Sequence, residues 1–208
     1  QRQRGRPSLH GPRDWNLLPR GRGKFTGQEL YGGDLYGVQE NLDHITNLGV
    51  NGIYFTPIFP SRSNHRYDAT SFDHVDPILG GDQAFISLIK ASKRKGIRIL
   101  GDLTSNHCGA GHEWLARAKR DKKSKERSYF YWDKSVKHGY VGWWGHASLP
   151  KLNFNSQALR KEIYEGKNSI VRKWLSPKFG MAGWRIDVGN MTGVQRSEEH
   201  TSELQSRQ

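Results

Sequence analysis

Apolar side chains first recur at helical spacing near residue 35. Five of them, three or four residues apart, predict a helix with one buried face: Leu35, Val38, Leu42, Ile45 and Leu48. Gly49 is typical of the residue that ends such a helix. The apolar run that follows, residues 50–57, is short and bounded by Gly and Pro, so it predicts a strand buried on both faces.

A second helix and strand are predicted after a polar loop at residues 58–80. Residues 81–96 place Asp82 near their start and basic residues just before Gly96, the charge order that a helix favours. The predicted buried face of this helix consists of Ala84, Phe85, Leu88 and Ile89. Residues 97–103 are another short apolar run, which predicts a second strand.

A third helix and strand lie near the end of the chain. Ser156 is a typical helix cap, and Pro177 is expected to close the helix. The predicted inward side chains are Leu159, Ile163, Ile170, Val171 and Trp174. The apolar run at residues 181–188 predicts the third strand. Helices alternate with buried strands three times, so we predict an α/β fold with a parallel sheet.

A long insertion separates the second strand from the third helix. Residues 104–155 far exceed an ordinary strand-to-helix loop of about two to six residues. Their aromatic side chains suggest a small subdomain with its own packing, and any that lie outside its core are candidates for sugar stacking: Trp114, Tyr129, Tyr131, Trp132, Tyr140, Trp143 and Trp144. The basic run at residues 118–128 is expected to be a solvated surface.

Composition changes this picture mainly at the two ends. The chain has 208 residues and a formal net charge of +13. Residues 1–28 are a basic lead-in rich in Arg, Gly and Pro, which we expect to form a loop. Residues 196–208 resemble a translated sequencing adapter and are excluded from the fold prediction. That tail holds two Arg and three Glu, so residues 1–195 carry +14.

Several protein classes are disfavoured by the same composition. A lone Cys108 excludes a disulfide-stapled miniprotein. No apolar run approaches the roughly 20 residues of a membrane-spanning helix, so no membrane partner is expected. The positive charge would suit a nucleic-acid-binding module. That charge is spread along the chain and no recognisable binding motif accompanies it, so we expect no nucleic-acid partner.

Polar side chains gather where each predicted strand ends. They are Asn64, His65, Tyr67 and Asp68 after the first strand, Asp102, Asn106 and His107 at the second, and Arg185 and Asp187 at the third. In parallel α/β barrels the carboxyl ends of the strands form the face on which active sites are built. These side chains are therefore candidates for one shared site.

Arg185 and Asp187 are two residues apart on a strand and should project to the same side. A guanidinium beside a carboxylate would hold and orient it, which suits a nucleophile. The same spacing also suits a buried ion pair with only a structural role, and spacing alone leaves both interpretations open.

Five motifs in a fixed order resemble one known family. YGGDLYGV, NGIYFTPIFPSRSNHRYD, DPILGG, GDLTSNH and GWRIDVGN together resemble the α-amylase superfamily, glycoside hydrolase family 13, over about residues 29–194. LPKLN at residues 149–153 resembles the neopullulanase and cyclomaltodextrinase relatives. An α-glucosidase-like member is the other subgroup considered.

The resemblance implies an α/β fold that is a partial (β/α)8 TIM barrel. The chain would supply about strands two to four, with an insertion like the family's domain B after the third strand. The expected segments are the lead-in at 1–28, the first part of the barrel at 29–103, the insertion at 104–156, helix three and strand four at 157–195, and the tail at 196–208.

The resemblance also implies roles for individual residues. Asp187 would be the catalytic nucleophile that forms a covalent glycosyl-enzyme, and Arg185 would hold its carboxylate. His107 would hydrogen-bond the sugar at the cleavage point, and Tyr67 would stack on its face. Asp102 and Asp68 would support this network from beneath.

The implied substrate is an α-glucan or malto-oligosaccharide, and no cofactor is required. Asn106 matches a calcium-ligand position in some family members, and Gly32 to Asp34 resemble part of a second calcium loop. The family's acid/base Glu and second catalytic Asp would lie beyond Val194. We therefore expect this chain alone to be inactive, because a retaining glycosidase needs two carboxyl groups.

Two further interpretations are kept open. Asp102, His107 and Asp187 could in principle converge on a metal ion in a metal-dependent hydrolase. A carbohydrate-binding module without catalysis would explain the aromatic residues but not an Arg–Asp pair at a strand end.

Overall fold

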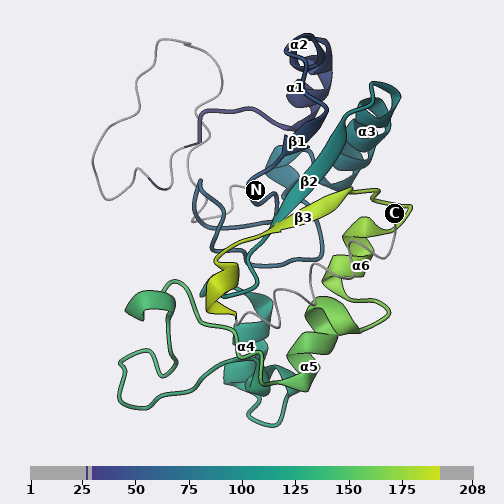
Figure 1. Ribbon diagram of the computed structural model, residues 1–208. Coiled ribbons are helices and arrows are strands. Elements are labelled where there is room, and N and C mark those ends of the chain that lie inside the picture. The colour runs from purple at the N-terminus through teal and green to yellow at the C-terminus, as the bar shows by residue number, and fades with distance from the viewer. Residues whose placement is uncertain (1–26, 28–29, 193–208) are drawn as a thin grey trace.

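The computed structural model describes residue 27 and residues 30–192. The rest of the predicted lead-in and the whole predicted tail lie outside the described residues. Three strands, β1 (Gly52–Tyr54), β2 (Arg98–Leu103) and β3 (Gly183–Ile186), pair in parallel in the order β1-β2-β3 (Figure 1). The predicted α/β class and parallel sheet are confirmed.

The first strand differs from its prediction. Only three residues of the apolar run form β1, and Val50 and Tyr54 are 43% and 45% exposed. The expectation of a strand buried on both faces is therefore wrong. Within the described residues β1 pairs only with β2, so one edge of this strand has no neighbouring strand to cover it.

The helix predicted at residues 35–48 is two short helices, α1 (Leu35–Glu40) and α2 (Leu42–Asn47). Asn41 separates them, and its side-chain amide donates to the carbonyl of Gly37 at 2.8 Å, in competition with the helical backbone bond. Leu48 lies beyond α2 and is 66% exposed, so its predicted burial is wrong. Gly49 has the expected left-handed backbone.

The second helix matches its prediction. Helix α3 spans Gly81–Arg94, with basic residues in its last turn and all four predicted apolar side chains buried. Gly80 precedes it with φ of +95°, and a Cβ there would approach the Ala84 Cβ to 2.5 Å. Glycine is therefore required where the chain enters α3.

The third predicted helix is also interrupted. Ser156 caps α5 (Gln157–Arg160) as predicted, and a wider π-turn, η5 (Lys161–Glu165), follows directly. The chain then leaves the helix at Gly166 and restarts as α6 (Ile170–Leu175), capped by Ser169. The five apolar residues predicted to face inward are all buried, so the predicted face is confirmed and the single helix is wrong.

Aromatic rings form the centre of the core between the sheet and helices α3 and α6. Trp174 lies 5.3 Å from Phe59, 5.8 Å from Phe85 and 4.4 Å from Phe179, measured between ring centroids. Its indole nitrogen donates to the carbonyl of Phe72 at 3.0 Å, which satisfies its one polar group. This cluster holds α6 against the loop that follows β1.

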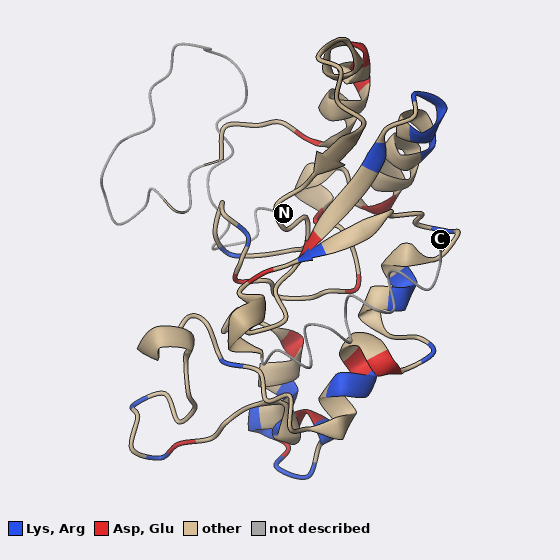
Figure 2. Cartoon of the chain, in the orientation of Figure 1, with Lys and Arg blue, Asp and Glu red and all other residues tan. Residues whose placement is uncertain are grey.

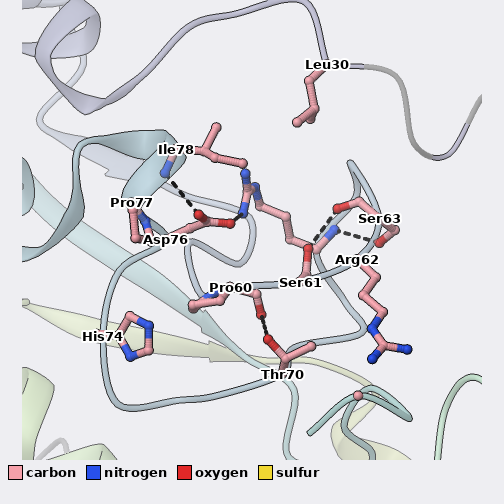
Figure 3. Close-up of a pocket in the computed structure, with 12 residues that line it drawn as sticks. Leu30, Pro60, Ser61, Arg62, Ser63, Thr70, His74, Asp76, Pro77 and Ile78 are labelled. Carbon is pink, nitrogen blue, oxygen red and sulfur yellow. Dashed lines mark hydrogen bonds and ion pairs between the residues drawn. The ribbon is translucent and has the colours of Figure 1, made fainter. Parts of the chain in front are cut away.

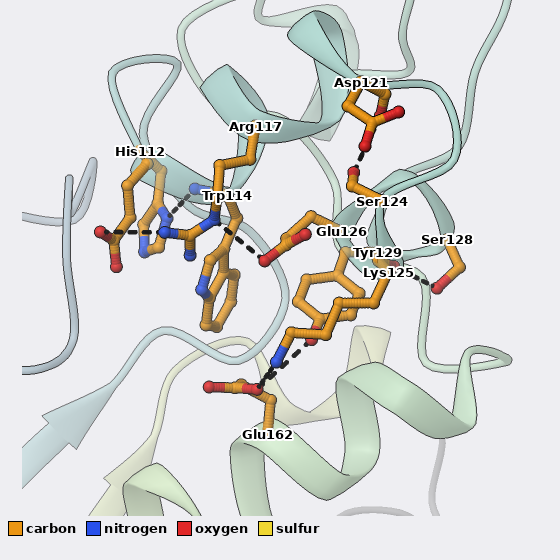
Figure 4. Close-up of polar contacts among 11 residues, drawn as sticks. His112, Trp114, Arg117, Asp121, Ser124, Lys125, Glu126, Ser128, Tyr129 and Glu162 are labelled. Atoms are coloured by element: carbon orange, nitrogen blue, oxygen red, sulfur yellow. Dashed lines mark hydrogen bonds and ion pairs between the residues drawn. The ribbon is translucent and has the colours of Figure 1, made fainter.

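The insertion packs around helix α4 (Glu113–Arg120). Two short 3₁₀ turns, η3 (Lys125–Tyr129) and η4 (Trp143–Gly145), follow it. Arg117 donates to the largely buried carboxylate of Glu126 at 2.9 Å, and Lys125 pairs with Glu162 of η5 at 2.8 Å (Figure 4). These contacts join the insertion internally and to the helix that follows it.

Two more 3₁₀ turns complete the described elements: η2 (Pro77–Leu79) before α3 and η6 (Gly189–Met191) after β3. Basic side chains are distributed over the end of α3 and the region of α4 and α5 (Figure 2). No helix within residues 30–192 combines the length and apolar character that crossing a membrane would need.

Candidate active site

The sheet register brings the strand-end side chains together. Asp102 of β2 and Arg185 of β3 are directly paired, and Tyr54 ends the neighbouring β1. The insertion leaves the sheet from the same end, because it begins directly after β2 (Figure 1). The carboxyl ends of the three strands therefore form the floor of the candidate site.

Asp102 lies at the centre of this site and contacts side chains from three other segments. Its side chain is fully buried, and its Oδ2 accepts hydrogen bonds from the hydroxyls of Tyr54 and Tyr67 and from Arg185 Nη1. The Tyr67 and Arg185 contacts measure 3.0 and 2.9 Å. Burial raises the pKa of Asp102, while the three donors act in the opposite direction. A fully buried carboxyl with these partners suits a supporting role.

The Arg185 guanidinium links this buried carboxylate to a more accessible one. Nη1 also donates to Asp187 Oδ1 at 2.6 Å, and the Asp187 side chain is 14% exposed. Asp187 follows β3 directly, and its backbone amide donates to the carbonyl of Leu103 at 3.0 Å. Val188 then adopts φ of +46°, which is unusual for a β-branched residue and marks a strained turn.

His107 lies near the start of the insertion, beside the Tyr67 loop. Its ring is 1% exposed and stacks on Trp143 with centroids 5.1 Å apart. Burial lowers the pKa of His107 to about 4, partly offset by the Tyr67 backbone and the Asp68 carboxylate. The imidazole is therefore neutral near pH 7 and can both donate and accept a hydrogen bond.

Tyr67 and Asp68 are positioned by the residue before them. Arg66 adopts φ of +66°, and its buried guanidinium donates to the carbonyl of Phe59 at 3.2 Å and to Asp76 Oδ2 at 2.6 Å. These bonds fix a left-handed turn from which Tyr67 reaches Asp102. Asp68 accepts a hydrogen bond from the hydroxyl of Ser63, which closes the loop internally.

A hollow of about 370 Å³ lies beside this loop (Figure 3). Its walls include Arg62, His74 and the Arg66–Asp76 pair. None of the predicted catalytic or sugar-binding residues lines it. The hollow is thus separate from the strand-end site, although both share the loop at residues 58–80.

The predicted site residues occupy the following places. The structure joins Tyr67, Asp102, Arg185 and Asp187 through direct contacts and sets His107 and Asp68 beside them. Three residues in this arrangement were missed: Tyr54, Arg66 and Asp76. Tyr54 and Arg66 lie within the quoted motif of residues 51–68, and Asp76 opens the DPILGG motif, so the motifs themselves were the available signal.

The residues present do not fit a calcium ion at Asn106. Its Oδ1 accepts a hydrogen bond from the Lys151 ammonium at 3.2 Å, and that charge would repel a divalent cation at the same oxygen. Asp34, in the second predicted calcium loop, accepts from the Gly37 amide at 2.8 Å and caps α1. Among residues 30–192 no three His, Cys, Asp or Glu side chains form a metal-binding group.

A second buried histidine lies behind the site at the start of α4. His112 is fully buried, with ring centroids 5.0 Å from Phe72 and 4.4 Å from Trp114, and its Nδ1 accepts from the Trp114 amide at 3.1 Å. Burial lowers the pKa of His112 to about 3. His112 and His107 are both neutral in the folded chain at pH 7.

These two histidines predict that acid destabilises the fold. Unfolded histidines have a pKa of about 6.5, so below that pH the unfolded state binds protons that the folded state does not. The free energy of unfolding should fall by up to about 1.4 kcal/mol per pH unit for each histidine between pH about 6.5 and 4. Urea denaturation across this range measures the slope.

The variant His112→Asn tests how much one histidine contributes to the pH dependence of stability. Asn is a good helix cap and can accept the Trp114 amide hydrogen, but it does not titrate. The plot of unfolding free energy against pH should lose about half of its histidine-dependent slope in this variant. The contribution of the carboxyl groups to the slope is common to both proteins. Parallel curves for the variant and the unaltered chain would contradict this prediction.

Comparison with known proteins gives a consistent family. Residues 17–207 match the family described as "Alpha amylase, catalytic domain". The intracellular maltogenic amylase of Bacillus subtilis (strain 168) is 34% identical over 178 residues, covering 84% of this chain and 29% of that protein. The chain therefore spans less than a third of the length of this curated relative.

Solved structures agree. The type III pullulan hydrolase from Thermococcus kodakarensis superimposes with a TM-score of 0.80 at 31% identity, over 97% of this chain and 34% of that one. The cyclic α-maltosyl-(1→6)-maltose hydrolase from Arthrobacter globiformis, in complex with maltose, gives a TM-score of 0.80 at 32% identity, over 93% of this chain and 44% of that one.

Proposed function

The chain belongs to the α-amylase catalytic-domain family, and from this premise we propose that it is the part of a retaining α-glycoside hydrolase that carries the nucleophile. The observation that carries the proposal is the shared guanidinium of Arg185, which joins fully buried Asp102 to partly exposed Asp187 at the carboxyl ends of two adjacent strands. We assign β1, β2 and β3 to strands two to four of the family's eight-stranded barrel. The insertion at residues 104–156 corresponds to domain B.

Asp187 is the nucleophile in this proposal. One carboxylate oxygen attacks the anomeric carbon, the bond from that carbon to the glycosidic oxygen breaks, and an acid elsewhere in the barrel protonates the leaving oxygen. Water then attacks the anomeric carbon of the glycosyl-enzyme and gives a proton to the group that acted as the acid, while the ester bond to Asp187 breaks and the carboxylate is regenerated. Arg185 holds one oxygen of Asp187 at 2.6 Å and so orients the carboxylate for attack.

Tyr67 and His107 bind the sugar that Asp187 attacks. The Tyr67 hydroxyl donates to Asp102, and His65 stacks on the Tyr67 ring with centroids 6.0 Å apart, so the opposite face of the ring would stack on the apolar C–H face of a pyranose. The neutral imidazole of His107 can donate to a sugar hydroxyl without placing a positive charge beside the developing cation. Asp68 and Asp102 support the two residues from beneath.

The proposed substrates are α-glucans or malto-oligosaccharides. The chain resembles a maltogenic amylase and the maltose-bound structure of a cyclic maltosyl-maltose hydrolase, which supports this substrate class. No cofactor is included in the proposal, because the Lys151 ammonium already binds the Asn106 oxygen at which calcium was expected. A metal-dependent hydrolase is disfavoured too, because the Arg185 cation already lies between Asp102 and Asp187.

The 208-residue chain alone should be inactive. The glutamates of its insertion and third helical stretch are engaged elsewhere: Glu113 and Glu126 pair with Arg117, Glu162 with Lys125 and Glu165 with Arg160. Asp102 is fully buried, and its Oδ2 accepts from Tyr54, Tyr67 and Arg185, which suits a supporting role rather than proton donation to a glycosidic oxygen. The second carboxyl group of the reaction must then come from the rest of the barrel.

Proton NMR of the first-formed product tests this function. A longer polypeptide that contains this chain and the rest of the barrel should hydrolyse maltotriose and release the α-anomer first, because two inversions retain the configuration. The 208-residue chain should show no turnover of a chromogenic α-glucoside. A β-anomer as first product contradicts the retaining mechanism, and turnover by the chain alone contradicts the missing acid. Binding of maltotriose by the longer polypeptide without any cleavage would favour a carbohydrate-binding function instead.

A further inference from the structure

Two tryptophans of the insertion extend the candidate site toward solvent. They lie in η4, within the turn of residues 142–146, which we call the tryptophan turn. Trp143 stacks on His107 with centroids 5.1 Å apart and planes 14° apart, and Trp144 stacks on Trp143 at 4.9 Å and 18°. The three rings form a continuous stack that begins at the proposed sugar-binding imidazole.

The outer end of this stack is an open indole. Trp144 is 74% exposed, the highest value among the exposed large hydrophobic side chains of the described residues. Its neighbours Gly145, His146 and Ser148 are exposed as well, and they are small or polar. An exposed ring in such surroundings contributes little to the core formed by residues 30–192, so packing within the described residues does not explain why a large aromatic residue is placed there.

The backbone holds Trp144 in an unfavourable conformation. Its φ and ψ are 49° and 31°, in the left-handed region that glycine favours. Strained residues of this kind persist only where the surrounding structure determines them, and they occur often at ligand sites. The position of the indole is thus imposed by the turn rather than by the preference of the residue itself.

The tryptophan turn is firmly attached to its surroundings. The Trp143 amide donates to the carbonyl of Leu149 at 2.8 Å, and the His146 amide donates to the carbonyl of Trp143 at 2.9 Å. A Cβ on Gly142 would approach the carbonyl oxygen of His146 to 2.1 Å, so the turn closes tightly at this glycine.

The same turn contacts the segment that follows the proposed nucleophile. The Trp143 indole nitrogen lies 3.1 Å from Met191 Sδ, in η6, four residues after Asp187. Figure 1 shows the yellow η6 turn and the green insertion on the same side of the sheet, beyond the carboxyl ends of the strands. The exposed indole therefore borders the proposed catalytic site.

We propose that Trp144 is a stacking platform for glucose units of an α-glucan beyond the unit held by Tyr67 and His107. The inference rests on the proposed function and adds a contact for longer chains to the same site. A pyranose presents an apolar C–H face that matches an indole, and its hydroxyls remain in water around the ring edge. Trp144 would thus favour malto-oligosaccharides over a single glucoside.

The variant Trp144→Gly tests this platform without disrupting the turn. Glycine adopts the left-handed backbone of this position without strain, so the thermal unfolding midpoint should be kept or raised. Ligand-observed NMR titrations would measure the affinities for maltohexaose and for methyl α-glucoside. They would use the longer polypeptide that contains this chain and the rest of the barrel, with Asp187→Asn so that neither ligand is cleaved. Maltohexaose should bind about 3- to 10-fold more weakly to the variant, and methyl α-glucoside should bind equally to both proteins.

Two further variants sharpen the comparison. Trp144→Phe keeps an aromatic face and should retain most of the affinity for maltohexaose. Tyr36→Ala removes another exposed aromatic ring, 43% exposed on α1, and should leave both affinities unchanged.

The outcomes separate this inference from the proposed function. Unchanged maltohexaose affinity in Trp144→Gly overturns the inference and leaves the function intact. An equal loss for both ligands also overturns it, since the ring would then act on the first sugar. Failure of the longer polypeptide with Trp144 intact to bind either ligand overturns both. Selective weakening of maltohexaose binding supports both.

Discussion

Asp187→Asn is expected to lower kcat of the complete enzyme toward maltotriose by at least about 10⁴-fold. An amide oxygen carries no full negative charge and cannot form the glycosyl ester, so the covalent route is closed. Asn keeps the size of Asp and can still accept a hydrogen bond from Arg185, so the fold should be retained. Steady-state kinetics with released glucose or maltose as the readout measures the loss.

A matched substitution controls for surface effects. Asp73 lies in the loop at residues 58–80 with 61% of its side chain exposed, and Asp73→Asn should leave kcat within about 2-fold. Mass spectrometry of the enzyme treated with a fluorinated α-glucosyl fluoride should find the sugar attached to Asp187. A label on another carboxylate, or undiminished turnover by Asp187→Asn, would remove this residue from its proposed role.

Asp76→Ala should lower the free energy of unfolding by about 3–5 kcal/mol. The substitution leaves the Arg66 guanidinium, 8% exposed, without its carboxylate partner in the interior. It also removes the cap that accepts the Ile78 amide at the start of η2. Urea denaturation of the variant and the unaltered chain measures the difference.

Asp43→Ala is the control for this stability prediction. Asp43 pairs with Lys95 on the surface with 81% of its side chain exposed, and an exposed ion pair contributes at most about 1 kcal/mol. If both variants lost the same amount, burial would not be what makes the Arg66–Asp76 pair important. Because Arg66 directly precedes Tyr67, Asp76→Ala should also weaken the binding of a single glucoside.

The sequence predicted elements well where local signals agreed. Helix α3 has an acidic residue at its start, basic residues at its end, a stopping glycine and one apolar face, and the structure has the helix almost as predicted. The breaks at Asn41 and Gly166 were missed, because the apolar spacing continues across both interruptions. Spacing reports which face is buried, whereas a break depends on local backbone bonds.

The motifs predicted which residues form the candidate site, but not all of the hydrogen bonds that join them. Tyr67, Asp102, Arg185 and Asp187 were expected at strand ends, and the structure joins them. The Tyr54 contact with Asp102 spans 48 residues, and the Lys151 contact with Asn106 spans 45. Such contacts depend on strand register and on the path of the insertion, which hydrophobic patterning does not specify. Lys151 belongs to the LPKLN motif, but the motif does not indicate its contact. Only the structure shows that the Lys151 ammonium binds the Asn106 oxygen at which a calcium ion was expected.

The single guanidinium nitrogen shared by two carboxylates also sets a charge balance for the proposed reaction. Before attack, Asp102, Asp187 and Arg185 together carry one negative charge, which favours a positively charged sugar beside it. Once Asp187 becomes an ester, its charge disappears and Arg185 is neutralised by Asp102 alone. The trio is then electrically neutral. When water attacks the anomeric carbon, the ester bond to Asp187 breaks and the carboxylate regains its negative charge beside the sugar cation, so the same attraction stabilises both steps of the reaction.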